Sequence, residues 1–344
     1  MLVNRTKSVI HFCLDARAAS GVSTFCEEID RALASQGVAS RIVRSLADLE
    51  AAPRPDVLHL HGLWLRPLHA ASVWARRHGV PVVWSTHGMT APWALAHKRW
   101  KKLPAWYLYQ RCDLLSAARI HCTSAAEVAW NAAALSLDPE DARRFVVAPL
   151  GTHLPDLSAG GTSGGNAAFE VLFVGRLYPV KGLENLLRAA ALLKGENMRF
   201  RLVGPDEAGY RAVLERLVRE LDLKSVTFAG ERPRDALAAE YAACDVLVLP
   251  SHSENFGATV VDALAWGKPV VASTGTPWRV LRDARCGWWT PNDPASLASV
   301  LREAANLPRD VRKEMGNRGR ALVARDYAWP AVAEKLYAAY AELA

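Results

Sequence analysis

Short apolar runs alternate with longer amphipathic stretches along the whole 344-residue chain. The runs are rich in Val, Ile, Leu and Phe, which is typical of buried strands. The stretches between them repeat apolar residues every three or four positions, as helices do. In the first half we predict strands at residues 9–14, 40–43, 56–62, 81–88, 119–123 and 144–149, and helices at 22–36, 68–78, 103–117 and 125–134. This alternation predicts βαβ units and a parallel sheet.

A segment rich in Gly and Ser, residues 158–167, interrupts the pattern and predicts a linker. The alternation then restarts, with strands expected at 169–175, 199–204, 226–230, 245–250 and 269–273 and helices at 182–193, 207–221, 235–243, 257–266 and 295–305. We therefore expect an N-terminal domain at 1–157, a second domain at 168–325, and a C-terminal helix at 326–344 that packs back toward the N-terminal domain. Both domains should be doubly wound α/β sheets, which bind ligands at the carboxyl ends of their strands.

Composition and charge narrow the class of protein. With 51% hydrophobic and 22% charged residues, the chain has the composition of a folded globular protein. Lys and Arg exceed Asp and Glu by 42 − 35 = +7, and the first 150 residues hold most of the excess, 18 − 12 = +6, a mild bias toward anionic partners. The six cysteines form no Cys-x-x-Cys pair, and the chain shows neither a secretory signal nor an apolar run of about 18 residues. We therefore expect a cytoplasmic protein with reduced thiols.

The most informative stretch is Ser-His-Ser-Glu-Asn-Phe-Gly at residues 251–257, directly after a predicted strand. Glu254 therefore lies in the loop at the carboxyl end of that strand, and Gly257 begins a predicted helix that contains Asp262. A helix N-terminus attracts anions such as phosphate. Asp262 follows Gly257 by about 7 Å along the helix, so the two carboxylates could hold two parts of one elongated ligand. For either residue alone, a solvated cap or an exposed helix acid is the alternative interpretation.

A second cluster follows the predicted strand 169–175. Gly175 and Arg176 end the strand, and Lys181 and Gly182 open the next helix. Two cations beside a tight turn and a helix start suit a diphosphate, because charge-assisted hydrogen bonds contribute about 1.5 to 3 kcal/mol each. Solvated surface bases are the alternative. Since the chain has no Asp-x-Asp motif, we do not expect a Mg²⁺ or Mn²⁺ clamp of that type.

Taken together, these motifs resemble the retaining family 4 glycosyltransferases of GT-B fold. The resemblance covers nearly the whole chain and implies two Rossmann-like domains that face each other across a cleft. The pieces that carry it are, in order, Ser20-Gly21-Val22, His59-Leu60-His61-Gly62, Thr86-His87-Gly88, Gly175-Arg176, Lys181-Gly182 and Glu254-Asn255-Phe256-Gly257 with an acid eight residues after Glu254. Residues 275–278 and 286–289 are similar to those of bacterial members that build surface polysaccharides or lipopolysaccharide cores.

The resemblance implies roles for individual residues. Arg176 and Lys181 would bind the diphosphate of a UDP- or GDP-linked sugar and stabilise it as it leaves. Glu254 would contact the donor sugar near the reacting centre, and Asp262 would hold the ribose hydroxyls, although the family usually has Glu at that position. The other implied contacts are Gly21, Gly175, Asn255, Phe256 and Gly257 with the donor, and His61 and His87 on the acceptor side, with His87 also bordering the reacting sugar. Such transfer needs neither a metal nor another cofactor.

Two further features admit more than one interpretation. His59 and His61 share a face of their strand and could begin a metal site, but no third ligand stands nearby in the sequence, so we expect no metal. The segment from Pro92 to Arg111 mixes aromatic residues with cations that suit an anionic membrane or a lipid-linked acceptor, and equally an ordinary helix with solvated lysines. These cations are Lys98, Arg99, Lys101 and Lys102. No nucleic-acid-binding module accompanies them, so we do not expect nucleic acid.

The sequence therefore predicts a metal-independent, anomer-retaining hexosyltransferase that acts on a glycan or lipid-linked acceptor, in the cytoplasm or peripherally on the inner face of the cytoplasmic membrane. Two alternatives stay open. One is a sugar-nucleotide epimerase on the same architecture, which would turn over without an acceptor. The other is a non-catalytic scaffold that binds nucleotide sugars, against which the intact Arg176, Lys181 and Glu254 argue. A dehydrogenase is disfavoured because the first predicted strand is not followed by the glycine triplet of a dinucleotide turn.

Overall fold

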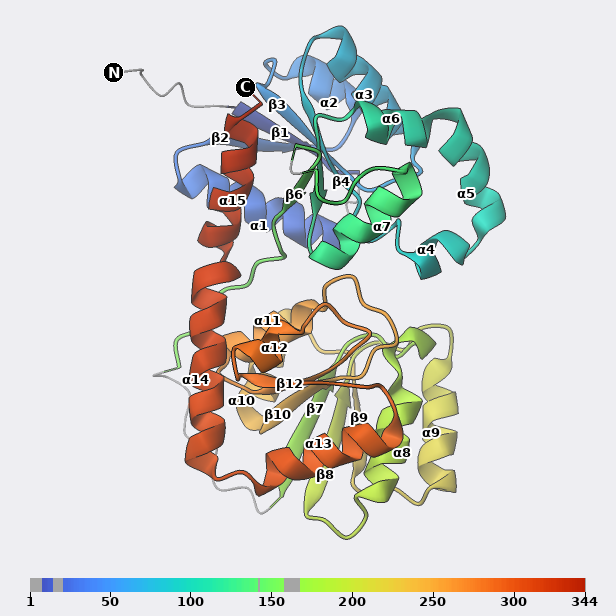
Figure 1. The fold of residues 1–344 in the computed structure, drawn as a ribbon, viewed down its shortest axis with the longest axis vertical. Helices are drawn as coiled ribbons and strands as arrows, with labels where there is room; N and C mark the ends of the chain where they lie inside the picture. The colour runs from blue at the N-terminus through green and yellow to red at the C-terminus, as the bar shows by residue number, and fades with distance from the viewer. Residues whose placement is uncertain (1–7, 15–20, 142, 158–167, 344) are drawn as a thin grey trace. The chain divides into compact units, whose positions relative to one another are not determined.

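The computed structural model describes residues 8–14, 21–141, 143–157 and 168–343. They form two compact units, the first made of residues 1–151 with 329–344 and the second of residues 152–328. Each unit contains one six-stranded sheet whose strand pairs are all parallel (Figure 1). The predicted α/β class with two doubly wound sheets is confirmed.

The first sheet has the strand order β2-β1-β3-β4-β5-β6. Its strands are β1 (Ser8–Phe12), β2 (Ala39–Val43), β3 (Val57–His61), β4 (Val82–Ser85), β5 (Arg119–Cys122) and β6 (Phe145–Val147). The helices of this unit are α1 (Gly21–Ser35), α2 (Leu46–Ala51), α3 (Arg66–Arg77), α4 (Pro92–Ala96), α5 (Arg99–Ala105), the π-helical turn η1 (Trp106–Gln110), α6 (Arg111–Ser116), α7 (Ala125–Leu135) and α15 (Trp329–Ala341).

Alternate residues of the first sheet enter two separate cores. Ile10 and Leu58 pack with residues of α3, α6 and α7, whereas Val9 and Val57 pack with residues of α1 and α15. Figure 1 shows α15 beside α1, which it contacts. Because both faces of the sheet are covered, the central strands consist mostly of buried residues, as expected for a parallel sheet.

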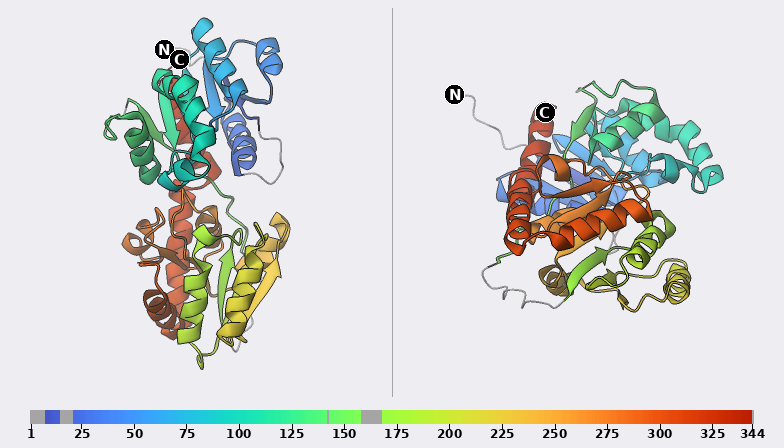
Figure 2. Two further views of the ribbon diagram at one scale, coloured as in Figure 1. Left: turned by 90° about the vertical axis from the view of Figure 1, so that its right-hand side faces the viewer. Right: turned by 60° about the horizontal axis from the view of Figure 1, so that its bottom comes forward.

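The second sheet has the strand order β9-β8-β7-β10-β11-β12. Its strands are β7 (Phe169–Val174), β8 (Met198–Val203), β9 (Val226–Gly230), β10 (Val246–Leu249), β11 (Val270–Ser273) and β12 (Gly287–Thr290). The helices are the 3₁₀ turn η2 (Pro179–Lys181), α8 (Leu183–Leu192), α9 (Tyr210–Glu220), α10 (Arg234–Ala243), α11 (Ala258–Ala265), α12 (Val280–Asp283), α13 (Pro294–Asn306) and α14 (Arg309–Asp326). Helices α8 and α13 pack side by side (Figure 2).

Three expectations about organisation need correction or completion. Residues 152–157 belong to the second unit rather than the first, because Thr152 donates its backbone N–H to Tyr327 and its hydroxyl to Asp262. The C-terminal segment divides at Ala328, so only residues from Trp329 onward join the first unit. The proposed linker 158–167 lies outside the described residues.

Strand β12 was not predicted from the sequence, because its short run, Gly-Trp-Trp-Thr, has none of the Val, Ile and Leu residues that mark the other strands.

Candidate functional site

The second sheet reverses its strand order between β7 and β10, and the candidate residues follow these two strands. Such a reversal opens a crevice at the carboxyl ends of the strands, where doubly wound sheets bind ligands. Arg176 and Lys181 lie in the connection after β7, and Glu254 lies in the loop after β10. The structure therefore brings Lys181 and Glu254 together at this point of the sheet, although 73 residues separate them in the chain.

Lys181 and Glu254 form an ion pair that is largely shielded from solvent. Lys181 Nζ donates to Glu254 Oε2 at 2.5 Å, and the two side chains are 13% and 16% exposed. Ser251 Oγ donates to the same carboxylate oxygen at 3.2 Å. The neighbouring Gly182 has φ +64°, and a Cβ there would lie 2.1 Å from the carbonyl oxygen of Pro250. Glycine is thus required for the close approach that places Lys181 beside the β10 loop.

Arg176 occupies a more open position than Lys181. Its side chain is 59% exposed and is paired with Glu207. The backbone before it is held by a tight approach, because a Cβ on Gly204 after β8 would lie 1.9 Å from the carbonyl oxygen of Gly175. Gly204 directly follows β8, just as Gly175 directly follows β7. It was not among the site residues predicted from the sequence. Arg176 is therefore engaged by Glu207, and the described contacts do not join it to the Lys181–Glu254 pair.

The run Asn255-Phe256-Gly257 leads from Glu254 into α11. Phe256 is buried against Trp278, whose indole N–H donates to the Phe256 carbonyl. Gly257 is the N-cap of α11 with φ +83°, and a Cβ there would approach Leu249 to 2.7 Å. These contacts fix the backbone at the start of the helix, so the predicted strand–loop–helix arrangement is present.

Asp262 lies more than one turn into α11 and contacts a different part of the unit from Glu254. Its carboxylate accepts a hydrogen bond from Thr152 Oγ1 at 2.6 Å. It also lines a pocket of about 250 Å³ together with Tyr241 and Trp266. Burial, and next the Asp262 carboxylate, raise the pKa of Tyr241 well above its usual value. Asp262 therefore lies beside a small pocket while bonded to Thr152, and the described contacts do not join it to the Lys181–Glu254 pair.

In the first unit, His61 is the last residue of β3 and His87 lies just after the neighbouring strand β4. This sheet reverses its order between β1 and β3; Gly21 begins α1 after β1, and His61 ends β3. Residues 15–20, which precede Gly21, lie outside the described residues. His87 follows β4 and has φ +50°, an uncommon conformation for a residue with a side chain and a frequent one at functional sites. Gly21, His61 and His87 thus all lie in segments at the carboxyl ends of strands.

A chain of three imidazoles leads from His87 into the core. His87 Nε2 is hydrogen bonded to His61 Nδ1 at 3.1 Å, and His61 Nε2 to His11 Nδ1 at 3.0 Å. His61 is 3% exposed and His11 is fully buried, so only the half-buried His87 reaches the surface. Burial lowers the pKa of His87 to about 4 and that of His11 to about 3. The chain is therefore uncharged at neutral pH, and each imidazole carries one proton.

The turn that holds His87 is organised by Glu127 of α7, a residue that the sequence did not single out. The Glu127 carboxylate is fully buried and accepts hydrogen bonds from Thr86 Oγ1 at 2.7 Å and the Gly88 N–H at 2.5 Å. Its second oxygen accepts from the N–H and hydroxyl of Thr123. Ser124 caps α7 three residues before Glu127, a spacing that marks a helix start but does not reveal the distant partner.

A second buried network lies on the same face of the sheet. His59 Nδ1 is hydrogen bonded to the Tyr340 hydroxyl at 2.6 Å, and its Nε2 to Ser85 Oγ at 2.7 Å. Ser85 Oγ also contacts His121 Nδ1 at 2.5 Å, and His121 Nε2 is hydrogen bonded to the Ala148 carbonyl. His59 is fully buried in the core. The sequence pattern missed Ser85, His121 and Tyr340, because they come from three separate elements.

One group within the described residues has the composition of a metal site. Ligand atoms of His11, His59 and His61 all lie within 4.8 Å of one another. Both nitrogens of His59 are already engaged by Tyr340 and Ser85, and His11 and His61 are bonded to each other. A tetrahedral zinc site would need ligand nitrogens about 2.0 Å from the ion, which requires these hydrogen bonds to break. The arrangement fits a hydrogen-bonded network better than a metal centre.

Comparison with known proteins identifies the family. The model of the family described as glycosyl transferases group 1 matches residues 166–322, and that of the glycosyl transferase 4-like domain matches residues 18–151. A D-inositol 3-phosphate glycosyltransferase of Thermomonospora curvata is 33% identical over 320 residues, which cover 85% of this chain and 73% of the relative. The chain belongs to the family 4 glycosyltransferases. The enzyme of the same name from Frankia alni is 32% identical over 83% of this chain and 74% of its own.

Solved structures share the fold of this glycosyltransferase. A sucrose-phosphate synthase from Thermosynechococcus elongatus has a TM-score of 0.75 at 20% identity and covers 98% of this chain and 99% of its own. Anabaena HepE in complex with UDP and glucose has a TM-score of 0.73 at 17% identity, and the match covers 98% of this chain and 100% of HepE. The fold of the glycosyltransferase is therefore GT-B, with a matched family domain in each unit.

Proposed function

We propose that the protein transfers a hexose from a nucleoside diphosphate sugar to an acceptor hydroxyl with retention of anomeric configuration and without a metal ion. The observation that carries the proposal is the shielded Lys181–Glu254 pair, with Arg176 nearby in the chain, at the strand reversal of the second sheet. The cations at this point are opposite in charge to a diphosphate and would attract it. The second sheet also has the strand order common among nucleotide-binding domains.

The chemistry follows from these groups. The bond between the anomeric carbon and the β-phosphate oxygen breaks, a bond from that carbon to the acceptor oxygen forms on the same face, and the acceptor proton passes to the departing phosphate. Lys181 and Arg176 stabilise the charge that develops on the leaving group, often the largest catalytic contribution. Because Lys181 and Ser251 both contact Glu254 Oε2, we propose that Oε1 accepts from a sugar hydroxyl.

The remaining residues bind rather than react. The N-terminus of α11, at Asn255, Phe256 and Gly257, offers backbone N–H groups toward phosphate, with Gly175 and Gly21 allowing close approach. We propose that the Asp262 carboxylate binds the ribose hydroxyls. The ribose would then either displace the Thr152 hydroxyl from this carboxylate or bind to it alongside Thr152. His87, backed by His61, contacts the acceptor as a neutral hydrogen-bonding group. Each of these roles positions donor or acceptor.

The acceptor that we propose is a glycan or lipid-linked molecule of bacterial surface polysaccharide or lipopolysaccharide synthesis, met at the inner face of the cytoplasmic membrane. A second candidate is a phosphorylated polyol, favoured by the relatives named D-inositol 3-phosphate glycosyltransferase. The two differ in charge and size, so they can be separated by direct assay. For the donor, UDP-glucose is the first choice, because HepE is described in complex with it.

The test is a transfer assay in excess EDTA, with UDP- and GDP-hexoses as donors and either inositol 3-phosphate or lipid-linked glycans as acceptors. We expect acceptor-dependent release of the nucleoside diphosphate, and NMR of the product should give the anomeric configuration of the donor. Transfer that requires added Mn²⁺ would contradict the metal-free mechanism, and an inverted product would contradict retention. Donor turnover without any acceptor would favour the epimerase alternative.

A further inference from the structure

The charge of the protein is concentrated in one continuous segment. Residues 57–112 contain eight Lys and Arg side chains and no Asp or Glu, a net charge of 8 − 0 = +8 that exceeds the +7 of the whole chain. The eight are Arg66, Arg76, Arg77, Lys98, Arg99, Lys101, Lys102 and Arg111. Because no carboxylate in the segment offsets them, this part of the first unit attracts anions.

The same segment presents an exposed apolar stripe. Helix α5, the turn η1 and helix α6 follow one another without a break from Arg99 to Ser116. Trp100, Tyr107 and Leu108 are 72%, 75% and 78% exposed, and Pro104 and Cys112 are exposed as well. Trp100, Pro104, Leu108 and Cys112 are spaced by four residues, so they share a helix face. Single exposed apolar residues are normal, but a row of them marks an interaction surface.

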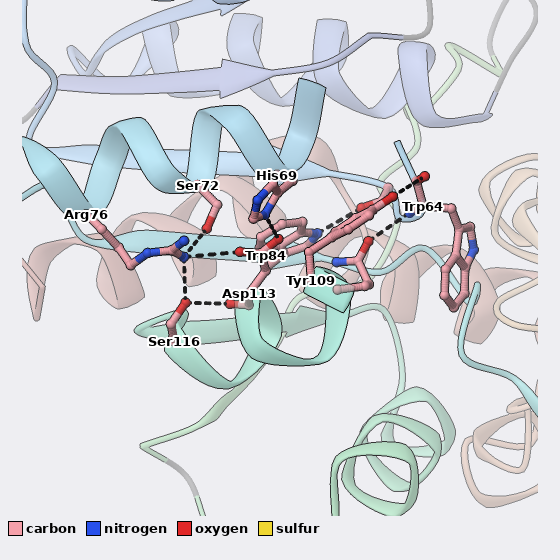
Figure 3. Close-up of polar contacts among 10 residues, drawn as sticks. Trp64, His69, Ser72, Arg76, Trp84, Tyr109, Asp113 and Ser116 are labelled. Atoms are coloured by element: carbon pink, nitrogen blue, oxygen red, sulfur yellow. Dashed lines mark hydrogen bonds and ion pairs between the residues drawn. The ribbon is translucent and has the colours of Figure 1, made fainter. Parts of the chain in front are cut away.

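The opposite face of this helical segment is firmly attached to the first unit. Tyr109 Oη donates to the Trp64 carbonyl, and the Trp64 N–H donates to Gln110 Oε1, both at 2.8 Å. Asp113, which is buried, contacts His69 at 2.7 Å and Arg76 at 3.1 Å (Figure 3). The nearest carboxylate along the chain is therefore turned inward and compensated. The exposed stripe is thus held on a rigid support, and Asp113 offsets Arg76 of α3 rather than Lys98, Arg99 or Lys101 beside the stripe.

A groove lies beside the stripe. It has a volume of about 660 Å³ and is lined by Leu95, Leu103, Trp106 and Tyr107 together with two cations, Arg99 and Lys102. Apolar and aromatic walls with cations suit an amphiphile that has an anionic head and a hydrocarbon body. A soluble anion would use the cations but leave the aromatic wall and the exposed stripe unexplained.

We infer that α5, η1 and α6 form a docking surface for an anionic phospholipid bilayer. The helical segment lies in the plane of the interface, with Trp100, Tyr107 and Leu108 inserted at headgroup depth and Lys98, Arg99 and Lys101 against lipid phosphates. Tryptophan and tyrosine favour this depth, and basic side chains near the surface are attracted to anionic lipids. Charge complementarity selects this occupant over a second copy of the chain, since two surfaces that both carry Lys98, Arg99, Lys101 and Lys102 repel each other. The inference deepens the location proposed above, at the inner face of the membrane, but its test is separate from that of the transfer, because lipid binding needs neither donor nor acceptor.

The test is co-sedimentation of the full chain with vesicles of phosphatidylglycerol and phosphatidylcholine in equal parts, and with vesicles of phosphatidylcholine alone. We expect binding to the anionic vesicles only, and its loss in about 1 M salt, where the Debye length is about 3 Å. Trp100→Ser with Leu108→Ser should weaken binding at least about tenfold, because apolar insertion is removed. Lys98→Gln with Lys101→Gln should weaken it by about fivefold for each charge.

Matched controls come from the second unit. Leu192 and Val213 are also exposed apolar residues, and Lys194 and Lys224 are exposed cations. Leu192→Ser with Val213→Ser, and Lys194→Gln with Lys224→Gln, should bind vesicles as the unchanged protein does. Equal binding to both vesicle types, no binding to either, or unchanged binding of the Trp100/Leu108 variant would overturn the inference. Light scattering that shows a dimer broken by the Trp100/Leu108 variant would also overturn it, in favour of a second copy.

Discussion

The two sheets carry different chemistry at the carboxyl ends of their strands. In the first unit the polar groups are neutral imidazoles, linked from His87 through His61 to His11 and held by hydrogen bonds. In the second unit they are ions, Lys181 and Glu254, held by charge. Both arrangements use parallel sheets with six strands and a strand reversal, so the fold alone does not decide the chemistry.

The difference suggests how the work is divided. A buried network of neutral groups is rigid and offers hydrogen bonds without attracting anions, which suits an acceptor hydroxyl. An ion pair can exchange its internal partner for a charged ligand, which suits a diphosphate. Lys181 is bonded to Glu254, so a donor that binds as we propose would compete with Glu254 for the lysine. We therefore expect changes in the second unit to act on donor chemistry and changes in the first unit to act on stability and acceptor use.

The largest expected effect is on the ion pair. Lys181→Met or Glu254→Gln should lower transfer by about 100-fold or more, because each removes a charge that acts on the leaving group or the donor sugar. Circular dichroism should show a folded protein in both cases. Lys194→Met, which removes an exposed lysine of the same unit, should leave the rate unchanged. A rate within about twofold of normal in either variant would remove that residue from the mechanism.

A second change tests the close approach behind Lys181. Gly182→Ala should lower the free energy of unfolding by about 3 kcal/mol, because the new Cβ would lie 2.1 Å from the Pro250 carbonyl and φ is +64°. Gly195→Ala is the matched control, since Gly195 has φ +91° but nothing within 4 Å of its Cβ position. It should cost about 1 kcal/mol through backbone strain alone. Equal losses in urea titrations would mean that the loops move apart easily.

A third change acts on the turn that holds His87. Glu127→Gln should lower the free energy of unfolding by about 2 kcal/mol, because an amide N–H₂ would face the donors that the buried carboxylate now accepts from. Glu140→Gln, at an exposed position of the same unit, serves as the control and should change nothing measurable. If the two variants unfold at the same urea concentration, Glu127 does not hold the turn as described.

A fourth test is the dependence of stability on pH. Burial lowers the pKa of His11 to about 3 and that of His87 to about 4, whereas an unfolded histidine titrates near about 6.5. The unfolded chain therefore binds more protons below pH 6.5, and stability present above that pH is lost as the pH falls toward 4. Below about pH 6.5, each such histidine should lower the free energy of unfolding by about 1.4 kcal/mol per pH unit.

Urea midpoints measured between about pH 7 and 5, above the titration of most carboxylates, should show this loss. His11→Asn removes one titrating group, so its midpoint should fall less steeply with pH than that of the unchanged protein. A urea midpoint of the unchanged protein that does not change with pH would contradict the description of these histidines as buried and neutral.

Much of the fold could be predicted from the sequence. Strands β1 to β11 and the restart after residue 168 follow from local apolar runs, and the ends of β7 and β10 carry Arg176, Lys181 and Glu254 within a few residues of a strand. Local patterns suffice there, because residues that follow neighbouring parallel strands meet at the same edge.

The rest depends on distant contacts. His59, Ser85, His121 and Tyr340 join one network only through the register of β3, β4 and β5 and the docking of α15. The contact of Asp262 with Thr152 across 110 residues and the hold of Glu127 on residues 86–88 are equally invisible in the chain. The boundary at Gly151 rather than residue 157 follows from the same Thr152 contacts.

The most direct measurement is a calorimetric titration of the unchanged protein and Lys181→Ala with UDP, GDP and ADP in excess EDTA. The ion-pair site predicts that one nucleotide binds the unchanged protein without metal and that Lys181→Ala weakens this binding by at least about tenfold, the loss of one charge-assisted contact. Binding that is equal in the two proteins, or that appears only when a divalent metal is restored, would contradict a donor site built on Lys181 and Glu254.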